Sequence, residues 1–194
     1  MALTPSTMLP LGTRAPAFTL TNAVDGRSVS LADYEGRPAL LVMFICNHCP
    51  YVQHVLKEIG RLAADYSSRG LAIVAINSNS AETHPQDGPE HMKTLAIAEG
   101  WAFPFLFDES QAVAKEYKAA CTPDFFLFDS EQRLAYRGQL DDSRPGNAIP
   151  VTGSDLRRAV DAVLEGSPIP EEQKPSMGCN IKWKPGHEPD YSSG

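Results

Sequence analysis

The stretch that decides the fold is ALLVMFICNHCPYV, residues 39–52. Its apolar run, Ala39 to Ile45, has the length and bulk of a buried central strand. The sequence Cys-Asn-His-Cys follows at residues 46–49, and Pro50 then opens a helix, because the first helical turn needs no backbone donor. A pair of cysteines with two residues between them therefore lies at a predicted strand-to-helix junction.

The segments that follow continue the alternation of strand and helix. Apolar residues at three- and four-residue spacing predict a helix from Val52 to Tyr66, which Gly70 ends. A second buried strand is predicted at Leu71 to Ile76. A polar loop at residues 80–90 then leads into a helical insertion from about Pro89 to Glu99.

The remaining patterns predict two hairpins and a last helix. One hairpin joins residues 16–20 to Ser28–Leu31, and the other joins Phe125–Phe128 to Arg133–Tyr136. Ser154 is expected to cap the last helix. Alternating elements of this kind predict a mixed α/β sheet with helices on both faces.

The chain length suits one domain, which we assign to residues 1–166. Residues 167–194 form a Pro/Gly-rich C-terminal tail, expected to pack on the domain or to trail from it. No apolar run has the roughly 18 to 20 residues that a membrane span needs. The N-terminus has no basic region followed by an apolar run, so a cytoplasmic location is expected.

Charge and motifs narrow the function classes. The net charge is −7, and Lys and Arg are scattered, so no nucleic-acid partner and no membrane partner are expected. Neither Gly-x-Gly-x-x-Gly nor a P-loop occurs, so no cofactor is expected. The four cysteines are Cys46, Cys49, Cys121 and Cys179. In a reducing compartment a close pair indicates redox chemistry or metal binding.

The position of Cys46 and Cys49 predicts their roles. The nucleophile in disulfide exchange is the thiolate, and backbone N–H groups at a helix N-terminus favour negative charge. We therefore expect a lowered pKa for Cys46, which attacks first, while the more buried Cys49 resolves the mixed disulfide. His48 and Asn47 would tune the pair, and His48→Pro is expected to lower the reduction potential.

FICNHCPYV at residues 44–52, Gly36-Arg37-Pro38 before the strand and Thr122-Pro123 before a later apolar strand together resemble the thioredoxin-like superfamily. The closer likeness is to its peroxiredoxin-like, AhpC/TSA "redoxin" branch, and it covers residues 12–187. It implies a thioredoxin fold with an N-terminal β-hairpin, a helical insertion after the second core strand and an irregular C-terminal tail. It also implies a cis Pro123 opposite the cysteine pair, with the Thr122 backbone shaping a substrate groove for an extended peptide.

The sequence departs from two patterns of these families. Leu40 stands where thioredoxins carry a buried acid, six residues before the first cysteine. Counting back from Cys46 for Pro-x-x-x-Thr/Ser-x-x-Cys meets Met43 and Ala39, so the usual peroxiredoxin site is absent. The second departure argues against efficient peroxide reduction.

Other residues have both a functional and a plain interpretation. Cys121 and Cys179 are possible auxiliary thiols, or a small buried residue and an incidental tail thiol. His54, His84 and His91 are expected to be surface histidines. Zinc on Cys46, His48, Cys49 and Cys121 is disfavoured, because structural zinc usually recruits two ligand pairs, so no metal is expected.

The first hypothesis is a thiol–disulfide oxidoreductase with a role in cell redox homeostasis and antioxidant defence. Its substrates would be protein or small-molecule disulfides, and its electrons would come from an external thiol donor. Two alternatives stay open: a peroxiredoxin-like thiol peroxidase, and a non-catalytic redox sensor or binding module.

Overall fold

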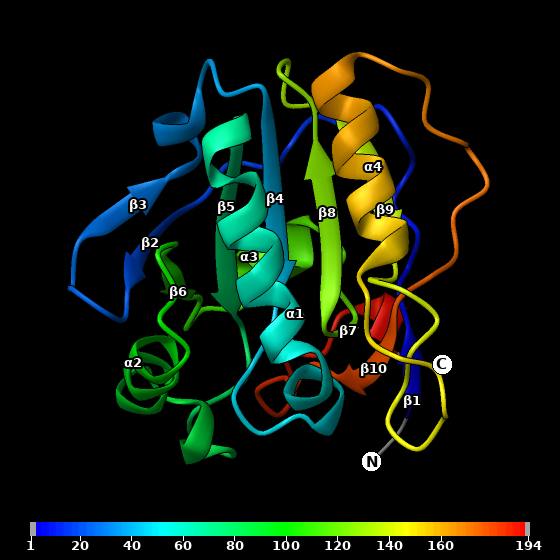
Figure 1. Cartoon of the computed structure of the whole chain (residues 1–194). Coiled ribbons are helices and arrows are strands. Elements are labelled where there is room, and N and C mark those ends of the chain that lie inside the picture. The colour runs from blue at the N-terminus through cyan, green and yellow to red at the C-terminus, as the bar shows by residue number, and fades with distance from the viewer. Residues whose placement is uncertain (1–2, 193–194) are drawn as a thin grey trace.

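The computed structural model describes residues 3–192, which contain a seven-stranded mixed sheet. Figure 1 shows helices on both faces of this sheet. The strand order is β3-β2-β6-β5-β4-β8-β9. The principal elements are β1 (Leu3–Pro5), β2 (Thr19–Asn22), β3 (Ser28–Ser30), β4 (Ala39–Phe44), α1 (Pro50–Tyr66), β5 (Leu71–Asn77), α2 (Pro89–Ala98), β6 (Phe105–Phe107), α3 (Ala112–Glu116), β7 (Cys121–Thr122), β8 (Asp124–Phe128), β9 (Leu134–Gly138), α4 (Ser154–Glu165) and β10 (Met177–Asn180).

Strand β4 is central and buried along its whole length. It pairs in parallel with β5 and antiparallel with β8. Both of its faces are covered, which explains a continuous apolar run in place of alternation. The strand ends at Phe44, so Cys46 and Cys49 lie just beyond the edge of the sheet, next to the ends of β5 and β8.

The two faces of the sheet carry separate apolar cores. Helices α1 and α4 cross the same face in Figure 1, where Leu56, Ile59 and Leu156 pack on Leu41 and Met43. Helix α3 packs on the other face. The core there contains the side chains of Phe44, Tyr117, Phe126 and Trp183, among others.

Most predicted elements are confirmed, with shifts of a few residues at their ends. Both hairpins form, as β2–β3 and β8–β9. The prediction that Ser154 caps the last helix is wrong: Gly153 is the N-cap, in a left-handed conformation, and Ser154 is the first helical residue. Within residues 3–192, no helix is long and apolar enough to cross a membrane.

The C-terminal segment packs on the domain. Strand β10 lies between β1 and β7 in a small second sheet, of order β1-β10-β7. Ile181 and Trp183 beyond it are buried in the core on the α3 side. Gly178 permits the close approach of β10 to β7, because a Cβ there would lie 2.1 Å from the Thr122 carbonyl oxygen.

We expect Gly178→Ala to destabilise the protein by about 1–3 kcal/mol, because its methyl group would force β10 away from β7. Gly60→Ala is the matched control, since it lies inside α1 and its Cβ would meet nothing closer than 3.9 Å. That control should stabilise the protein by about 0.5–1 kcal/mol. Urea unfolding of both variants measures the difference, and equal midpoints would contradict the close packing of β10.

Candidate active site

Cys46 and Cys49 lie in the short connection between β4 and α1, and both side chains are completely buried. Cys49 is the N-cap of α1, and Pro50 follows it at the first helical position. Cys46 precedes the cap by three residues. The expectation that Cys49 is the more buried of the two is therefore wrong, because neither residue is exposed to solvent.

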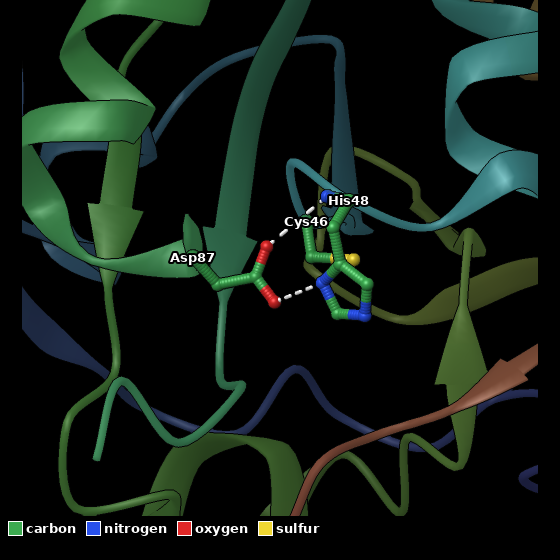
Figure 2. A group of neighbouring side chains, drawn as sticks. All are labelled: Cys46, His48 and Asp87. Carbon is green, nitrogen blue, oxygen red and sulfur yellow. Dashed lines mark hydrogen bonds and ion pairs between the residues drawn. The ribbon is translucent and has the colours of Figure 1, made fainter. Parts of the chain in front are cut away.

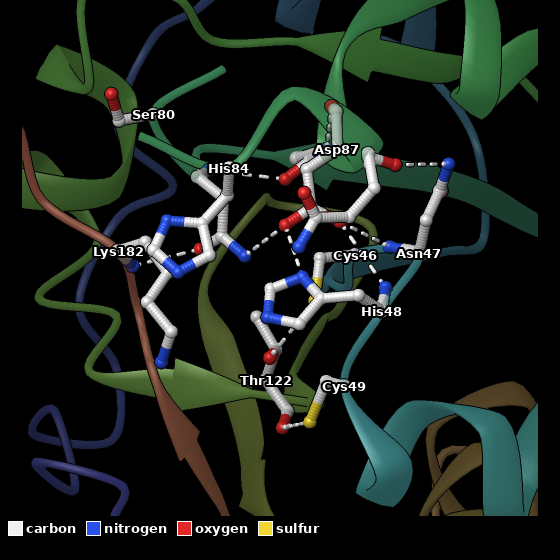
Figure 3. Close-up of polar contacts among 12 residues, drawn as sticks. Cys46, Asn47, His48, Cys49, Ser80, His84, Asp87, Thr122 and Lys182 are labelled. Carbon is white, nitrogen blue, oxygen red and sulfur yellow. Dashed lines mark hydrogen bonds and ion pairs between the residues drawn. The ribbon is translucent and has the colours of Figure 1, made fainter. Parts of the chain in front are cut away.

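Thr122 contacts both sulfurs of the pair, as Figure 3 shows. The Cys46 Sγ lies 3.4 Å from the Thr122 Oγ1, and the Cys49 thiol donates to the Thr122 carbonyl oxygen at 3.1 Å. The Thr122–Pro123 peptide bond is cis, as the family resemblance implied. Thr122, which was predicted to face the cysteine pair, therefore does so.

A buried carboxylate, Asp87, fixes the loop between the two cysteines. Its Oδ1 accepts hydrogen bonds from the backbone N–H groups of Asn47 and His48, at 2.9 and 3.2 Å. Its Oδ2 lies 2.5 Å from the His48 Nδ1 and accepts a hydrogen bond from Asn79. Figure 2 shows the imidazole and the carboxylate beside Cys46. Asp87 therefore orients both residues predicted to tune the pair.

Asp87 is a site residue that was not predicted, because its sequence neighbourhood, residues 80–90, has only the pattern of a polar loop. One signal could have found it: Asn77 ends β5 and Asn79 follows it, and β5 runs parallel to β4. Ends of neighbouring parallel strands meet at one edge of a sheet. Polar residues after β5 are thus brought to the loop after β4, where Asn77 and Asn79 both bind Asp87.

Two of the three histidines expected at the surface have defined partners. The His84 ring stacks on His48, with ring centroids 5.1 Å apart. Burial, together with the positive charges that His48 and Lys182 can carry, lowers the pKa of His84. His54 shares a hydrogen bond of 2.7 Å with the Ser143 hydroxyl. Only His91 is exposed as expected.

The two thiols of the pair differ in acidity, in the order opposite to the prediction. Donation of a hydrogen bond to Cys49, burial and the negative charge of Asp87 raise the pKa of Cys46. The hydrogen bond accepted from Cys46 lowers the pKa of Cys49 to about 4. Cys49 itself is the N-cap of α1, whereas Cys46 lies three residues before the cap and faces the Asp87 carboxylate.

Cys121 and Cys179 lie on adjacent paired strands, and no disulfide joins any of the four cysteines. Cys179 is buried and hydrogen-bonds to Cys49. Cys121 precedes Thr122, and the alternation of side chains along β7 turns its thiol to the opposite face. There it lies near Ser6 and Asp124, and burial raises its pKa. Of the two arrangements expected for the tail, packing on the domain is the one that holds Cys179.

The expected role of Thr122 also needs correction. Its backbone was predicted to offer an open edge to an extended peptide, with Pro123 beside it. In the structure Thr122 is paired with Cys179 of β10. That edge is covered, and a peptide could pair with Thr122 only after β10 moved away.

A metal ion could use a different set of ligands from the one considered in the sequence. Cys46, His48 and Asp87 each bring one donor atom to within 4.8 Å of the others. Three such donors suit a tetrahedral zinc ion with one open position. The same atoms of His48 and Asp87 already hydrogen-bond to each other, so the trio is also complete as a purely protein arrangement.

Comparisons with known proteins agree on the fold and the family. The Redoxin family model matches residues 10–156. A Mycobacterium tuberculosis protein named "Putative peroxiredoxin" is 33% identical over 117 residues, which cover 60% of this chain and 69% of that protein.

Two solved structures are similar over most of the chain. An uncharacterized conserved protein from Geobacillus kaustophilus is 58% identical, with a TM-score of 0.93 over 95% of this chain and 98% of that one. The thioredoxin domain of a thiol-disulfide oxidoreductase from Bacteroides vulgatus has a TM-score of 0.63 at 20% identity, over 80% of this chain and 99% of that one. The latter shows the thioredoxin fold alone.

We expect the reduced protein to carry one thiolate near neutral pH, which is protonated as the pH falls toward about 4. Cys46→Ala should raise that pKa toward the ordinary value of a thiol, because it removes the hydrogen bond that Cys49 accepts. The ultraviolet absorbance of the thiolate, followed against pH, measures the change. Cys121→Ala, which alters a thiol on the opposite face, should leave the titration unchanged; a low pKa retained in Cys46→Ala would contradict the assignment.

Proposed function

Because the chain belongs to the Redoxin family and has the thioredoxin fold, we propose that it is a thiol–disulfide oxidoreductase whose redox pair is Cys46 and Cys49. One observation carries the proposal: the two thiols hydrogen-bond to each other and to opposite ends of Thr122. A disulfide between them needs only the approach of two sulfurs already in contact.

Cys46 and Cys49 can share one proton, and hydrogen bonds stabilise the pair whichever sulfur holds it. When Cys49 is the thiolate, it accepts a hydrogen bond from Cys46. When the proton moves to Cys49, the Thr122 carbonyl accepts it in a hydrogen bond, and the Thr122 hydroxyl can donate to Cys46. Cys49 can therefore act as the base that deprotonates Cys46, which fits the apolar Leu40 on β4, where no acid is available.

Cys46 attacks the substrate disulfide as its proton passes to Cys49. One substrate sulfur leaves as a thiolate and the other stays bonded to Cys46. Cys49 then attacks the Cys46 sulfur, its proton goes to the second substrate thiolate, and a Cys46–Cys49 disulfide remains. An external thiol donor reduces this disulfide and returns the enzyme to its starting state, as thiols of the cytoplasm would.

The substrates are disulfides of proteins or small molecules, and the burial of both sulfurs bears on which react faster. Because Cys46 and Cys49 are 0% exposed, a folded protein reaches them only after a covering segment moves. A small-molecule disulfide needs a smaller movement of the covering segments to reach the two sulfurs. The groove expected at Thr122 and Pro123 is narrow: beside Pro123, the pocket lined by Tyr51, His54 and Met177 has a volume of about 20 Å³.

Peroxide reduction is the second candidate function, which would give the protein an antioxidant role. It is favoured by the likeness to the Mycobacterium tuberculosis protein named as a peroxiredoxin. It is opposed by the absence of Pro-x-x-x-Thr/Ser-x-x-Cys before either cysteine of the pair. Direct comparison of the two reactions separates these candidates.

We expect the reduced protein to reduce insulin and oxidised glutathione faster than it reduces hydrogen peroxide, with the small disulfide the faster of the two. Cys49→Ser should abolish turnover and accumulate a mixed disulfide on Cys46, which mass spectrometry detects. Cys121→Ser is the matched control and should keep full turnover. Rapid peroxide consumption with little disulfide reduction would make the protein a peroxidase, and slow reaction with all three would favour the redox sensor.

His48 and Asp87 should set the reduction potential as a balanced pair of charges. His48→Ala leaves the Asp87 carboxylate uncompensated near the thiolate of the redox pair, so the reduced form loses stability and the potential falls. The fall should be about 30 mV for each 1.4 kcal/mol lost. Adding Asp87→Asn removes the opposing charge and should restore much of the potential in a glutathione titration. A double variant no different from His48→Ala would contradict this charge balance.

A further inference from the structure

A third thiol lies against the redox pair, and it comes from the C-terminal segment of the chain. Cys179 of β10 is paired in register with Thr122 of β7. Directly opposite residues of an antiparallel pair project to the same face, with Cβ atoms about 4.5–5.5 Å apart. The Thr122 hydroxyl on that face contacts Cys46, so Cys179 projects toward the pair as well.

The packing of the core agrees with the strand register. Cys46, Cys49 and Cys179 belong to one apolar cluster on the α1 side of the sheet. The Cys179 thiol donates a hydrogen bond to the Cys49 sulfur. Cys49 therefore has a cysteine partner on each side, one three residues earlier and one 130 residues later in the sequence.

Burial decides which reactions Cys179 can enter. Its side chain is 3% exposed, so a bulky external disulfide does not reach it without a movement of β10. An attack within the protein needs no such access. The tight β10–β7 contact at Gly178 holds the thiol in place, since no side chain larger than hydrogen fits there.

We propose that Cys179 is a third redox-active thiol, which exchanges with the Cys46–Cys49 disulfide to form an alternative Cys49–Cys179 disulfide. The inference rests on the proposed function, because the starting disulfide is the product of that reaction. The Cys179 sulfur bonds to the Cys49 sulfur, the Cys46–Cys49 bond breaks, and the proton of Cys179 ends on Cys46. Electrons balance without an added oxidant, because one disulfide replaces another.

The exchange has a chemical consequence for the enzyme. It returns Cys46 to the thiol form while the chain still holds its disulfide. Cys46 is the thiol next to His48 and Asp87. The exchange therefore makes Cys46 available to react with a second disulfide. The oxidised protein is then a mixture of two disulfide isomers that share Cys49.

Cys121 supplies a control from the same small sheet. It adjoins Thr122 on β7 and pairs with Asn180, one residue from the Cys179 pairing. Alternation along β7 directs its thiol to the opposite face, where it lies near Ser6 and Asp124 and donates to the Pro123 carbonyl oxygen, although Cys49 and Cys179 are also close enough to act on its charge. A disulfide that forms by simple proximity along the chain could involve Cys121, whereas the proposed exchange cannot.

The test maps disulfides in the wild type and in Cys46→Ala, Cys179→Ser and Cys121→Ser after oxidation with diamide, rapid alkylation and tryptic digestion. Cys46 and Cys49 fall in one peptide, between Arg27 and Lys57, while Cys179 falls in another, which ends at Lys182. The Cys46–Cys49 disulfide is thus internal to a peptide, and Cys49–Cys179 links two peptides. Fragmentation between residues 46 and 49 identifies the linked cysteine.

We expect both isomers in the wild type and in Cys121→Ser, only Cys49–Cys179 in Cys46→Ala, and only Cys46–Cys49 in Cys179→Ser. Circular dichroism confirms that each variant is folded. A wild type containing Cys46–Cys49 alone, with Cys49 and Cys179 both alkylated in folded Cys46→Ala, would overturn this inference and leave the proposed function intact. A linkage of Cys49 to Cys121 would also overturn it, and a wild type that lacks Cys46–Cys49 would overturn the proposed function.

Discussion

The geometry of the site depends on one buried carboxylate. Asp87 is 0% exposed, and a buried charge is tolerated only when hydrogen-bond donors surround it. Two backbone N–H groups of the Cys-x-x-Cys loop, the His48 ring and the Asn79 amide meet this need. The loop between the cysteines is therefore held to the segment after β5, and its shape does not depend on the helix alone.

The predictable part of the fold is the part with local signals. The apolar run of β4, the apolar spacing along α1 and the turns of both hairpins can each be recognised from a few consecutive residues. Asp87 lies 40 residues from Asn47, and β10 pairs with β1 at the N-terminal end and with β7, which is also distant in the sequence. Strand β10 forms in a segment with few aliphatic residues, because backbone pairing and one glycine suffice to seat it, and composition alone does not reveal such pairing.

The same distinction explains what was predicted of the site. Cys46, Cys49, Thr122 and Pro123 were recognised together because their motifs are compact and the family resemblance joins them. The order of acidity within the pair was missed, since it depends on the hydrogen bond between the two thiols and on a charge from a distant loop. The helix begins at Pro50, as predicted, so its N-cap is Cys49, and Cys46 lies three residues further from the favourable end of the helix dipole.

The site balances two opposing influences on a buried thiolate. Burial disfavours a thiolate at either sulfur and the Asp87 charge disfavours one at Cys46, whereas hydrogen bonds donated by Cys46 and Cys179 favour a thiolate at Cys49. Oxidation removes the thiolate and, with it, both influences. The reduction potential thus depends on how closely they cancel, and His48 is the one residue of the loop that can offset the Asp87 charge directly. A neutral side chain at position 48 would shift this balance without altering the fold around the cysteines.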